Sequence, residues 1–359
     1  MTTGEERPRF TVRPLPEREA EVSLPAEFQT RRLLRRLAEV VALIVVLVLV
    51  ALLAPGLGEV RDVLSRADPG WLLVGVALEL ASCGSYIVMF RPIFCRHMSR
   101  RSAWEIGWAE LGVGSIVPAS GAGGLALGAW VLNRSGMPGD RIARRSVAFF
   151  LIKGSVNFVA VAVIGFAMAV GLVGPEKSLW LTAFPAALSV LVIVAVVAIG
   201  RVGPGAPVAP GASRLRRWVW ASRRALVGGV EEALAIIRSP DPAVLFGALG
   251  YWLFDNAVLW ATYRAFDATI PLTVLVMGYL IGQLGGLLPL PGGIGGIDGG
   301  LIGTLIVFGA PAAVTAAAVF AYRLILFWLP LIVGAAAFVS LRNGLNRPDR
   351  PDLCPAPAR

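Results

Sequence analysis

The sequence predicts an all-α, polytopic membrane protein with two inverted-topology repeats, each containing a re-entrant, broken helical hairpin. The first observation is composition: 56% of the 359 residues are hydrophobic and the mean hydropathy is +0.72, against about 45–50% apolar residues in soluble domains. The second is that several apolar segments reach the roughly 20 residues that cross a bilayer. The third is an internal similarity at one fixed offset along the chain.

The charge balance indicates a membrane surface. The formal charge is +10, from 33 Lys and Arg residues against 23 Asp and Glu residues, and only Lys153 and Lys177 are lysines. The arginines cluster beside apolar segments, which the positive-inside rule and anionic headgroups explain better than nucleic-acid binding does. We therefore expect no nucleic-acid partner.

Few residues could hold a metal or a haem. Cys83, Cys95 and Cys354 form no CxxC pair, and His97 is the only histidine. Zinc and haem sites need clustered ligands, so no cofactor and no metal are expected.

The two ends of the chain are predicted to be cytoplasmic. Residues 1–37 are polar and rich in Pro and Arg, too long and too charged for the start of a signal peptide. We interpret them as a cytoplasmic tail, disordered until about Glu27. A transmembrane domain is expected over residues 38–342, followed by a second cytoplasmic tail over residues 343–359.

The first two spans precede a broken segment. Val40–Ala54 follows two arginine pairs and leads outward, and Trp71–Phe90 returns to a basic loop. Trp104–Leu132 is apolar but is interrupted by glycines and a proline, of which each glycine costs a helix about 1 kcal/mol and the proline about 3 kcal/mol. We predict a re-entrant hairpin that begins and ends on the cytoplasmic side.

The rest of the chain repeats this plan after a long loop. The predicted elements are an outward span at Val147–Val173, a return at Leu179–Ile199, a cytoplasmic loop at 201–238, an outward span at Val244–Tyr263, a second broken segment at Leu272–Phe308 and a final span at Val314–Leu341. Within the loop, Arg214–Arg224 is amphipathic and suits an anionic leaflet.

The distribution of cations fixes the predicted orientation. In this topology 27 of the 33 Lys and Arg residues lie inside and four lie outside, while Lys153 and Arg323 lie within spans. This asymmetry favours cytoplasmic termini and a bacterial inner membrane.

A shift of 173 residues superimposes parts of the sequence on each other. It places Asp68-Pro69 on Asp241-Pro242, Arg91 on Arg264, Pro118 on Pro291 and Gly123 on Gly296. A further slip of three residues would bring Lys153 onto Arg323. We predict repeat units at about 68–173 and 241–341; the alternative is the general likeness of apolar helices. The units begin on opposite sides, a plan whose substrate sites lie at interrupted helices near the midplane.

The interruptions are therefore candidate substrate-binding sites. Their prolines end a half-helix, and their glycines expose backbone N–H groups that could bind an anion. The candidates are Pro118, Gly123 and Gly124 in the first unit, and Pro291, Gly292, Gly293 and Gly295 in the second. The alternative is a tightly packed helix break. Neither a dinucleotide fingerprint nor a P-loop lysine is present.

Ionisable residues within spans are further candidates, because they are costly in a bilayer. They are Glu79, Lys153, Asp255, Asp298 and Arg323. Arg323 could pair with Asp298 or hold a phosphate, and Lys153 could act likewise in the first unit; the alternative for Arg323 is a structural ion pair. We expect Glu79 to lie near an interface.

Two polar residues and the lack of a catalytic group complete the inventory. Asn157 and Asn256 are expected to hydrogen-bond between helices. No Ser or Cys has a visible base nearby in the sequence, so the chain is not expected to be an enzyme.

A run of residues in the second unit resembles the lysylphosphatidylglycerol synthase transmembrane region, also called the flippase-like domain family. The matching positions are Pro289 to Asp298, Gly309, Ala316, Arg323 and Trp328. The resemblance covers about residues 35–342. Asp298 stands where the family usually has Glu, and residues 118–124 lack the Arg and Glu of many members. We therefore expect this chain, which ends at Arg359, to lack the soluble aminoacyl-transferase domain of two-part members.

Together these features predict a protein that binds, and translocates between leaflets, an anionic phospholipid or a polyprenyl-linked glycan. In this interpretation Arg323 and Lys153 hold the headgroup, and Asp298 is their counter-charge or a proton carrier. One alternative is a scaffold for a separate membrane glycosyl- or acyltransferase, contacted through residues 214–238. Others are an ion-coupled small-solute transporter, or a transferase that would need an acid/base pair.

Overall fold

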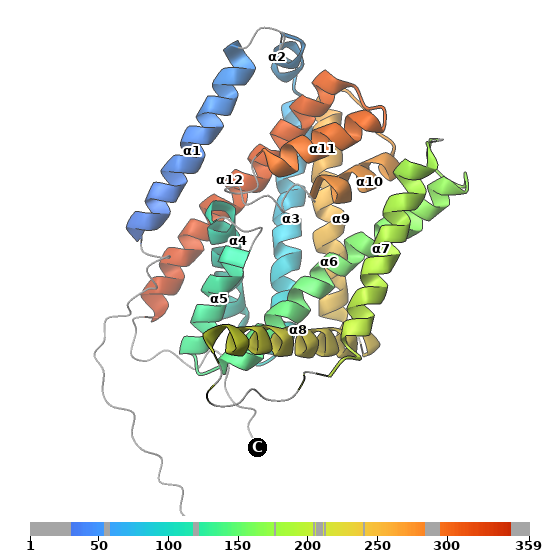
Figure 1. Ribbon diagram of the computed structural model, residues 1–359. Coiled ribbons are helices and arrows are strands. Elements are labelled where there is room, and N and C mark those ends of the chain that lie inside the picture. The colour runs from blue at the N-terminus through green and yellow to red at the C-terminus, as the bar shows by residue number, and fades with distance from the viewer. Residues whose placement is uncertain are drawn as a thin grey trace, which may run out of the picture.

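The structure of the chain is a computed structural model that describes residues 30–53, 58–117, 122–175, 177–203, 205, 211, 213–239, 241–283 and 295–345. Within these ranges every regular element is a helix (Figure 1). Their bounds are α1 Thr30–Leu53, α2 Gly58–Ser65, α3 Pro69–Phe94, α4 Arg100–Ile116, α5 Ala122–Arg134, α6 Gly139–Ala169, α7 Leu179–Ile199, α8 Arg214–Arg238, α9 Pro242–Ala265, α10 Leu272–Gln283, α11 Gly296–Val307 and α12 Ala312–Leu345.

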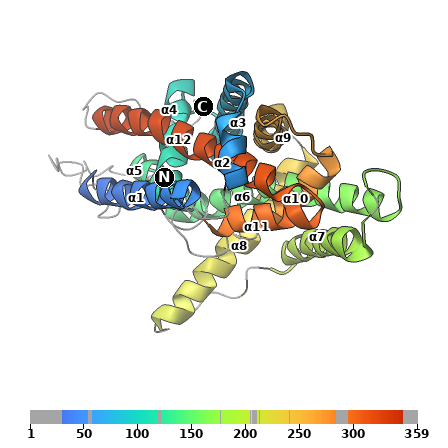
Figure 2. The ribbon, with the colours of Figure 1, turned by 90° about the horizontal axis from the view of Figure 1, so that it is seen from above.

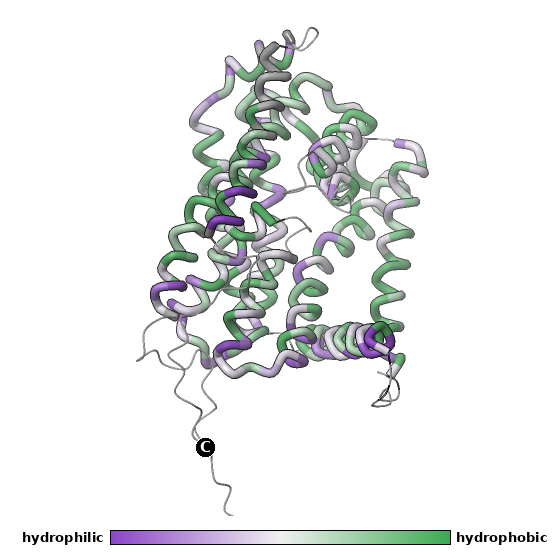
Figure 3. The backbone as a smooth tube through the Cα atoms, turned by 60° about the vertical axis from the view of Figure 1, so that its left-hand side comes forward, coloured by the Kyte–Doolittle hydropathy of each residue, from purple (hydrophilic) through white to green (hydrophobic). Residues whose placement is uncertain are grey.

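Five of the described helices are long and apolar enough to cross a membrane. They are α3, α6, α7, α9 and α12, and hydrophobic residues dominate the long helices in Figure 3. The prediction of an all-helical, polytopic membrane protein is confirmed. The bounds of α7 are those predicted, whereas α6 begins at Gly139, before the predicted Val147, and α1 begins inside the predicted tail.

Helices α3 and α9 pack side by side along their lengths (Figure 2). Both begin in the same way, with an aspartate cap followed by proline, whose fixed φ suits the first helical position. Asp68 accepts a hydrogen bond from the Gly70 N–H at 2.7 Å, and Asp241 accepts one from Ala243 at 3.0 Å. The Asp-Pro pairs that the sequence shift superimposes therefore start two equivalent, paired helices.

Each broken apolar segment forms a pair of short helices. The first pair is α4 and α5, and the second is α10 and α11; the members of each pair pack against each other. In Figure 1 the first pair lies in the lower half of the molecule and the second in the upper half. The residues that join the helices of each pair, 118–121 and 284–294, lie outside the described part of the chain.

Two apolar cores divide the interior. The first gathers around α3, α4, α5 and the start of α6, with Phe90, Trp108 and Phe149 among its fully buried side chains. The second gathers around α9, α10, α11 and α12 and includes Met277 and Tyr322. Each core is thus built mostly from one of the two predicted units.

Helix α12 ties the two cores together by crossing α4 at a pair of glycines. A Cβ placed on Gly112 would lie 2.8 Å from the Cα of Gly334. This contact is closer than real Cβ atoms tolerate, so the absence of side chains lets the two backbones touch. Small residues are the usual means of close helix packing in membranes.

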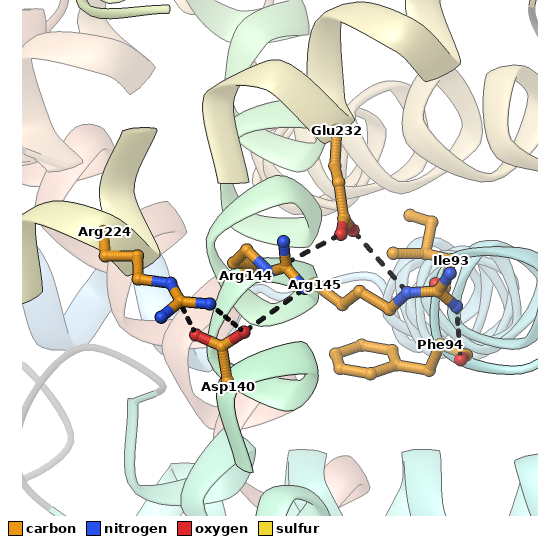
Figure 4. A network of polar contacts seen from close by, with 7 residues as sticks. All are labelled: Ile93, Phe94, Asp140, Arg144, Arg145, Arg224 and Glu232. Atoms are coloured by element: carbon orange, nitrogen blue, oxygen red, sulfur yellow. Dashed lines mark hydrogen bonds and ion pairs between the residues drawn. The ribbon is translucent and has the colours of Figure 1, made fainter. Parts of the chain in front are cut away.

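Helix α8 lies across the lower end of the bundle, crosswise to the upright helices α3 and α9 (Figure 1). It is amphipathic, as predicted, and extends beyond Arg224 to Arg238. Ion pairs hold it to α6: Glu232 lies 3.9 Å from Arg144 and 3.6 Å from Arg145 (Figure 4). Arg224 pairs with Asp140 at 3.4 Å.

The ion pairs between α6 and α8 continue to the end of α3 through Arg145. One guanidinium nitrogen of Arg145 donates hydrogen bonds to the carbonyl oxygens of Ile93 at 2.9 Å and Phe94 at 2.6 Å. These carbonyls belong to the last turn of α3, where helical partners are missing. Arg145 therefore joins α3, α6 and α8 at the basic end of the molecule.

Candidate functional site

A polar cavity of about 280 Å³ lies between the two cores. Helices α3, α4, α5, α6, α9, α10, α11 and α12 all contribute to its wall. Its polar lining residues are Glu79, Ser82, Cys83, Tyr86, Glu110, Ser115, Lys153, Tyr251, Asp255, Gln283 and Arg323. Apolar spans thus enclose several ionisable groups, which the bilayer makes costly unless they have partners or a function.

Asp255 is the best satisfied of the cavity's carboxylates. It accepts hydrogen bonds from the hydroxyls of Tyr279 on α10 and Tyr322 on α12, the latter at 2.9 Å. Its side chain comes from α9, so three helices of the second unit meet at this group. Buried hydrogen-bonded networks of this kind hold their members in fixed positions.

The other two buried carboxylates each keep one oxygen without a partner. Tyr86 donates to Glu110 Oε2 at 2.8 Å, and the Cys83 thiol donates to Glu79 Oε1 at 3.3 Å. Among the described residues, Glu110 Oε1 and Glu79 Oε2 are buried and have no hydrogen-bond partner. A buried acceptor without a partner is costly, and Glu110 Oε1 lies against the backbone of α5 at Gly128.

Lys153 lies in a cage of aromatic rings. Its Nζ atom is 5.2 Å from the ring centres of Phe150 and Tyr251 and 5.7 Å from that of Tyr86. Cation–π attraction is stronger where water is excluded. The cage therefore positions the ammonium group at the cavity wall through rings instead of a salt bridge.

Arg323 and Asp298 form the ion pair that the sequence suggested. Arg323 Nε lies 2.6 Å from Asp298 Oδ1, with about a fifth of each side chain exposed. Asp298 Oδ2 also accepts the N–H of Gly295 at 2.8 Å, which caps α11. Gly295 has a φ of +86°, a left-handed conformation that glycine adopts without strain. The pair thus connects the start of α11 to α12 at the cavity.

The structure brings only some of the predicted site residues to the cavity. Arg323 and Lys153 line the cavity. Asp298 is not among its lining residues but forms an ion pair with Arg323. Gly123 and Gly124 pack against α4 instead: a Cβ on Gly124 would overlap the backbone of Glu110. The contacts of these two glycines are those of the alternative given above for the interruptions, a tightly packed helix break. Pro118, Pro291, Gly292 and Gly293 lie outside the described residues.

Two expectations about polar residues need correction. Glu79 was expected near an interface, but it lies in the interior of the 26-residue α3 and is 5% exposed. The reason is that α3 packs along α9, which places Glu79 at the central cavity. Asn157 does bond between helices, accepting from Trp252 at 3.1 Å, whereas Asn256 donates to the carbonyl of Trp252 in its own helix.

Sequence reasoning missed Glu110 and the cavity tyrosines. Glu110 is 2% exposed and lies in α4, and the sequence already shows it as a lone carboxylate between Ala109 and Leu111. It was passed over because the whole segment was interpreted as a hairpin defined by its glycines. Gly128 on α5 makes room for it, since a Cβ there would overlap its carboxylate.

The arrangement suits binding of a polar group, with cations and acceptors facing one space. Arg323 and Lys153 can attract a phosphate, and the oxygens of Glu79 and Glu110 can accept from hydroxyl or amine groups. Within the described part of the chain, no group of three His, Cys, Asp or Glu side chains is placed to hold a metal ion.

The helices and the buried polar cavity define a multi-pass membrane protein with a polar site enclosed by its spans. The chain belongs to the lysylphosphatidylglycerol synthase TM region family, whose model matches residues 39–334. The family resemblance seen in the sequence is therefore confirmed.

Two curated proteins of Methanothermobacter thermautotrophicus, both named UPF0104 membrane protein, are similar to the chain. The first is 26% identical over 310 residues, which is 80% of this chain and 90% of that protein. The second is 27% identical over 116 residues, covering 31% of this chain and 35% of that protein. Their printed names give a membrane location and no activity.

Proposed function

We propose that the protein binds the headgroup of an anionic or glycosylated lipid in the central cavity and moves it between leaflets. The observation that carries the proposal is the combination in one cavity of two cations, Arg323 and Lys153, with two buried carboxylate oxygens that have no partner among the described residues. A headgroup that contains a phosphate and hydroxyl groups could pair its phosphate with the two cations and donate its hydroxyls to the two carboxylates.

The roles of the residues follow from their present partners. The guanidinium of Arg323 can bind two phosphate oxygens at once, with Asp298 as its counter-charge. Lys153 can leave the aromatic cage for a phosphate, because cation–π attraction is weaker than a charge-assisted hydrogen bond. Glu110 and Glu79 would then accept from the hydroxyls of the headgroup.

The arrangement of helices supports an inverted repeat around this cavity. The starts of α3, α5 and α6 lie within one residue of those of α9, α11 and α12 after the shift of 173 residues. The pairs α4–α5 and α10–α11 lie toward opposite ends of the molecule in Figure 1. We infer two re-entrant hairpins that enter from opposite sides and meet at the cavity, with α8 and the basic end facing the cytoplasm of a bacterial cell.

Leaflet exchange in proteoliposomes tests the proposal. Vesicles carrying the full chain should exchange fluorescent phosphatidylglycerol between leaflets faster than protein-free vesicles, measured by dithionite quenching of the outer-leaflet label. Arg323→Lys keeps the charge but loses the planar fork, so exchange should fall about tenfold, the ratio that corresponds to 1.4 kcal/mol.

Two results would contradict the proposal. If the folded wild-type protein gives no exchange of phosphatidylglycerol or of a polyprenyl-phosphate sugar, the scaffold function for a membrane transferase becomes the better interpretation. If Arg323→Lys exchanges at the wild-type rate, the phosphate is not bound by the guanidinium.

A further inference from the structure

A second cavity, of about 570 Å³, lies at the basic end of the molecule, where α3 ends and α4 and α9 begin. It shares no described lining residue with the central cavity. Its lining residues are Ile87, Val88, Arg91, Pro92, Arg96, Arg100, Ala103, Trp104, Asp241 and Ala243. We refer to it as the basic groove.

The mouth of the groove carries three arginines and one carboxylate. Arg91 Nε donates to the carbonyl of Arg96 at 3.1 Å, which positions it at the end of α3. The guanidinium of Arg96 pairs with Asp241 at 3.0 Å, and its side chain is 70% exposed. Arg100 lies in the first turn of α4. The lining therefore has an excess of two positive charges, which suits one phosphate group.

Part of the groove's wall is apolar, formed by residues of the span α3 and of the neighbouring helix α4. Val88 on α3 and Trp104 on α4 are 49% and 52% exposed. The Trp104 ring stacks edge-on against Trp108, with 5.8 Å between the ring centres, which orients it. Exposed apolar side chains on a membrane span face lipid, and tryptophan prefers the level of the headgroups. A hydrocarbon chain can therefore lie against this wall.

We infer that the basic groove is a binding site for an anionic phospholipid. Arg91 and Arg100 hold the phosphate, and an acyl chain lies against Val88 and Trp104. A charged mouth above an apolar wall fits a lipid better than a free phosphate, which has nothing to place against Trp104. The inference does not depend on translocation, because the groove and the central cavity have separate linings.

Native mass spectrometry of the purified full chain tests it. The chain in detergent is titrated with dioleoylphosphatidylglycerol or with dioleoylphosphatidylcholine, and the retained lipid is counted. Arg100→Gln should reduce retained phosphatidylglycerol about tenfold, because it removes a charge-assisted partner of the phosphate. Arg101→Gln is the matched control, since Arg101 is 84% exposed, pairs with Glu105 and does not line the groove.

Asp241→Asn gives the opposite change. Asparagine still caps α9, but it removes the negative charge that pairs with Arg96, so the groove becomes more positive and retention of phosphatidylglycerol should rise. The loss caused by Arg100→Gln should also persist in an Arg323→Gln background, because the two sites are separate. This arm distinguishes the groove from the site of the proposed translocation.

Three outcomes would overturn the inference. Equal losses in Arg100→Gln and Arg101→Gln would indicate general charge attraction. No loss in Arg100→Gln, with folded protein confirmed by thermal unfolding, would remove the groove as a lipid site. Displacement of phosphatidylglycerol by excess inorganic phosphate would make it an anion site without a lipid requirement.

Discussion

At the scale of single residues, the Arg323–Asp298 pair can act on substrate or hold the fold, and a double-mutant cycle separates these roles. Arg323→Gln and Asp298→Asn should each destabilise the protein by about 1–3 kcal/mol, because each removes one charge of a partly buried ion pair. The doubly neutral protein should recover folded yield but not exchange of labelled phosphatidylglycerol.

Thermal unfolding and leaflet exchange on the same four proteins measure both properties. Recovery of exchange in the double variant would assign the pair a structural role only. The headgroup would then depend on Lys153 and the carboxylates of the cavity.

Lys153 offers a second test at this scale, because three aromatic rings surround its ammonium group, with the carboxylates of Glu110 and Asp255 in the same cavity. Lys153→Met keeps the length and fills the same aromatic cage, and methionine contacts aromatic rings favourably. The variant should therefore unfold within a few degrees of wild type, yet lose exchange about tenfold if the ammonium binds phosphate. Unfolding temperature and exchange rate are the two measurements, and unchanged exchange would exclude Lys153 from the site.

Among the helices, the crossing of α4 and α12 depends on the absence of two side chains. Gly112→Ala would place a Cβ 2.8 Å from Gly334, and such overpacking costs about 1–3 kcal/mol. Gly154→Ala on α6 is the matched control, because a Cβ there meets nothing within 4 Å. In detergent, Gly112→Ala should have a lower thermal unfolding midpoint than wild type, and Gly154→Ala should not. Equal midpoints for the two variants would mean that α4 and α12 can move apart without loss of stability.

The re-entrant geometry of the two helix pairs predicts which ends share a side of the membrane. In a cysteine-free background, His97→Cys precedes α4 and Asn133→Cys lies in the last turn of α5, while Thr269→Cys precedes α10 and Ala312→Cys follows α11. An impermeant maleimide should label the first two from the cytoplasm only and the last two from outside only. Labelling of the two flanks of one pair from opposite faces would show a full span instead.

The helices themselves were largely predictable from the sequence, whereas the cavity was not. Apolar runs, arginine flanks and the Asp-Pro pairs place the long helices, because these signals depend on neighbouring residues and on the bilayer. The aromatic cage around Lys153 of α6 takes Tyr86 from α3 and Tyr251 from α9, and Glu110 of α4 is bonded by Tyr86, so these contacts depend on how the helices pack. Only Arg323 with Asp298 could be proposed as a pair, since both stood out as charges in apolar surroundings.

At the scale of the whole molecule, ion pairs and helix packing join its two halves. Arg144 and Arg145 of the first half hold Glu232 of α8 in the second, and α3 lies along α9. A chain cut between Gly203 and Ser213 would leave every one of these contacts intact. Two co-expressed fragments should therefore reassemble in the membrane and co-purify through a tag on one of them, as the products of two separate genes would.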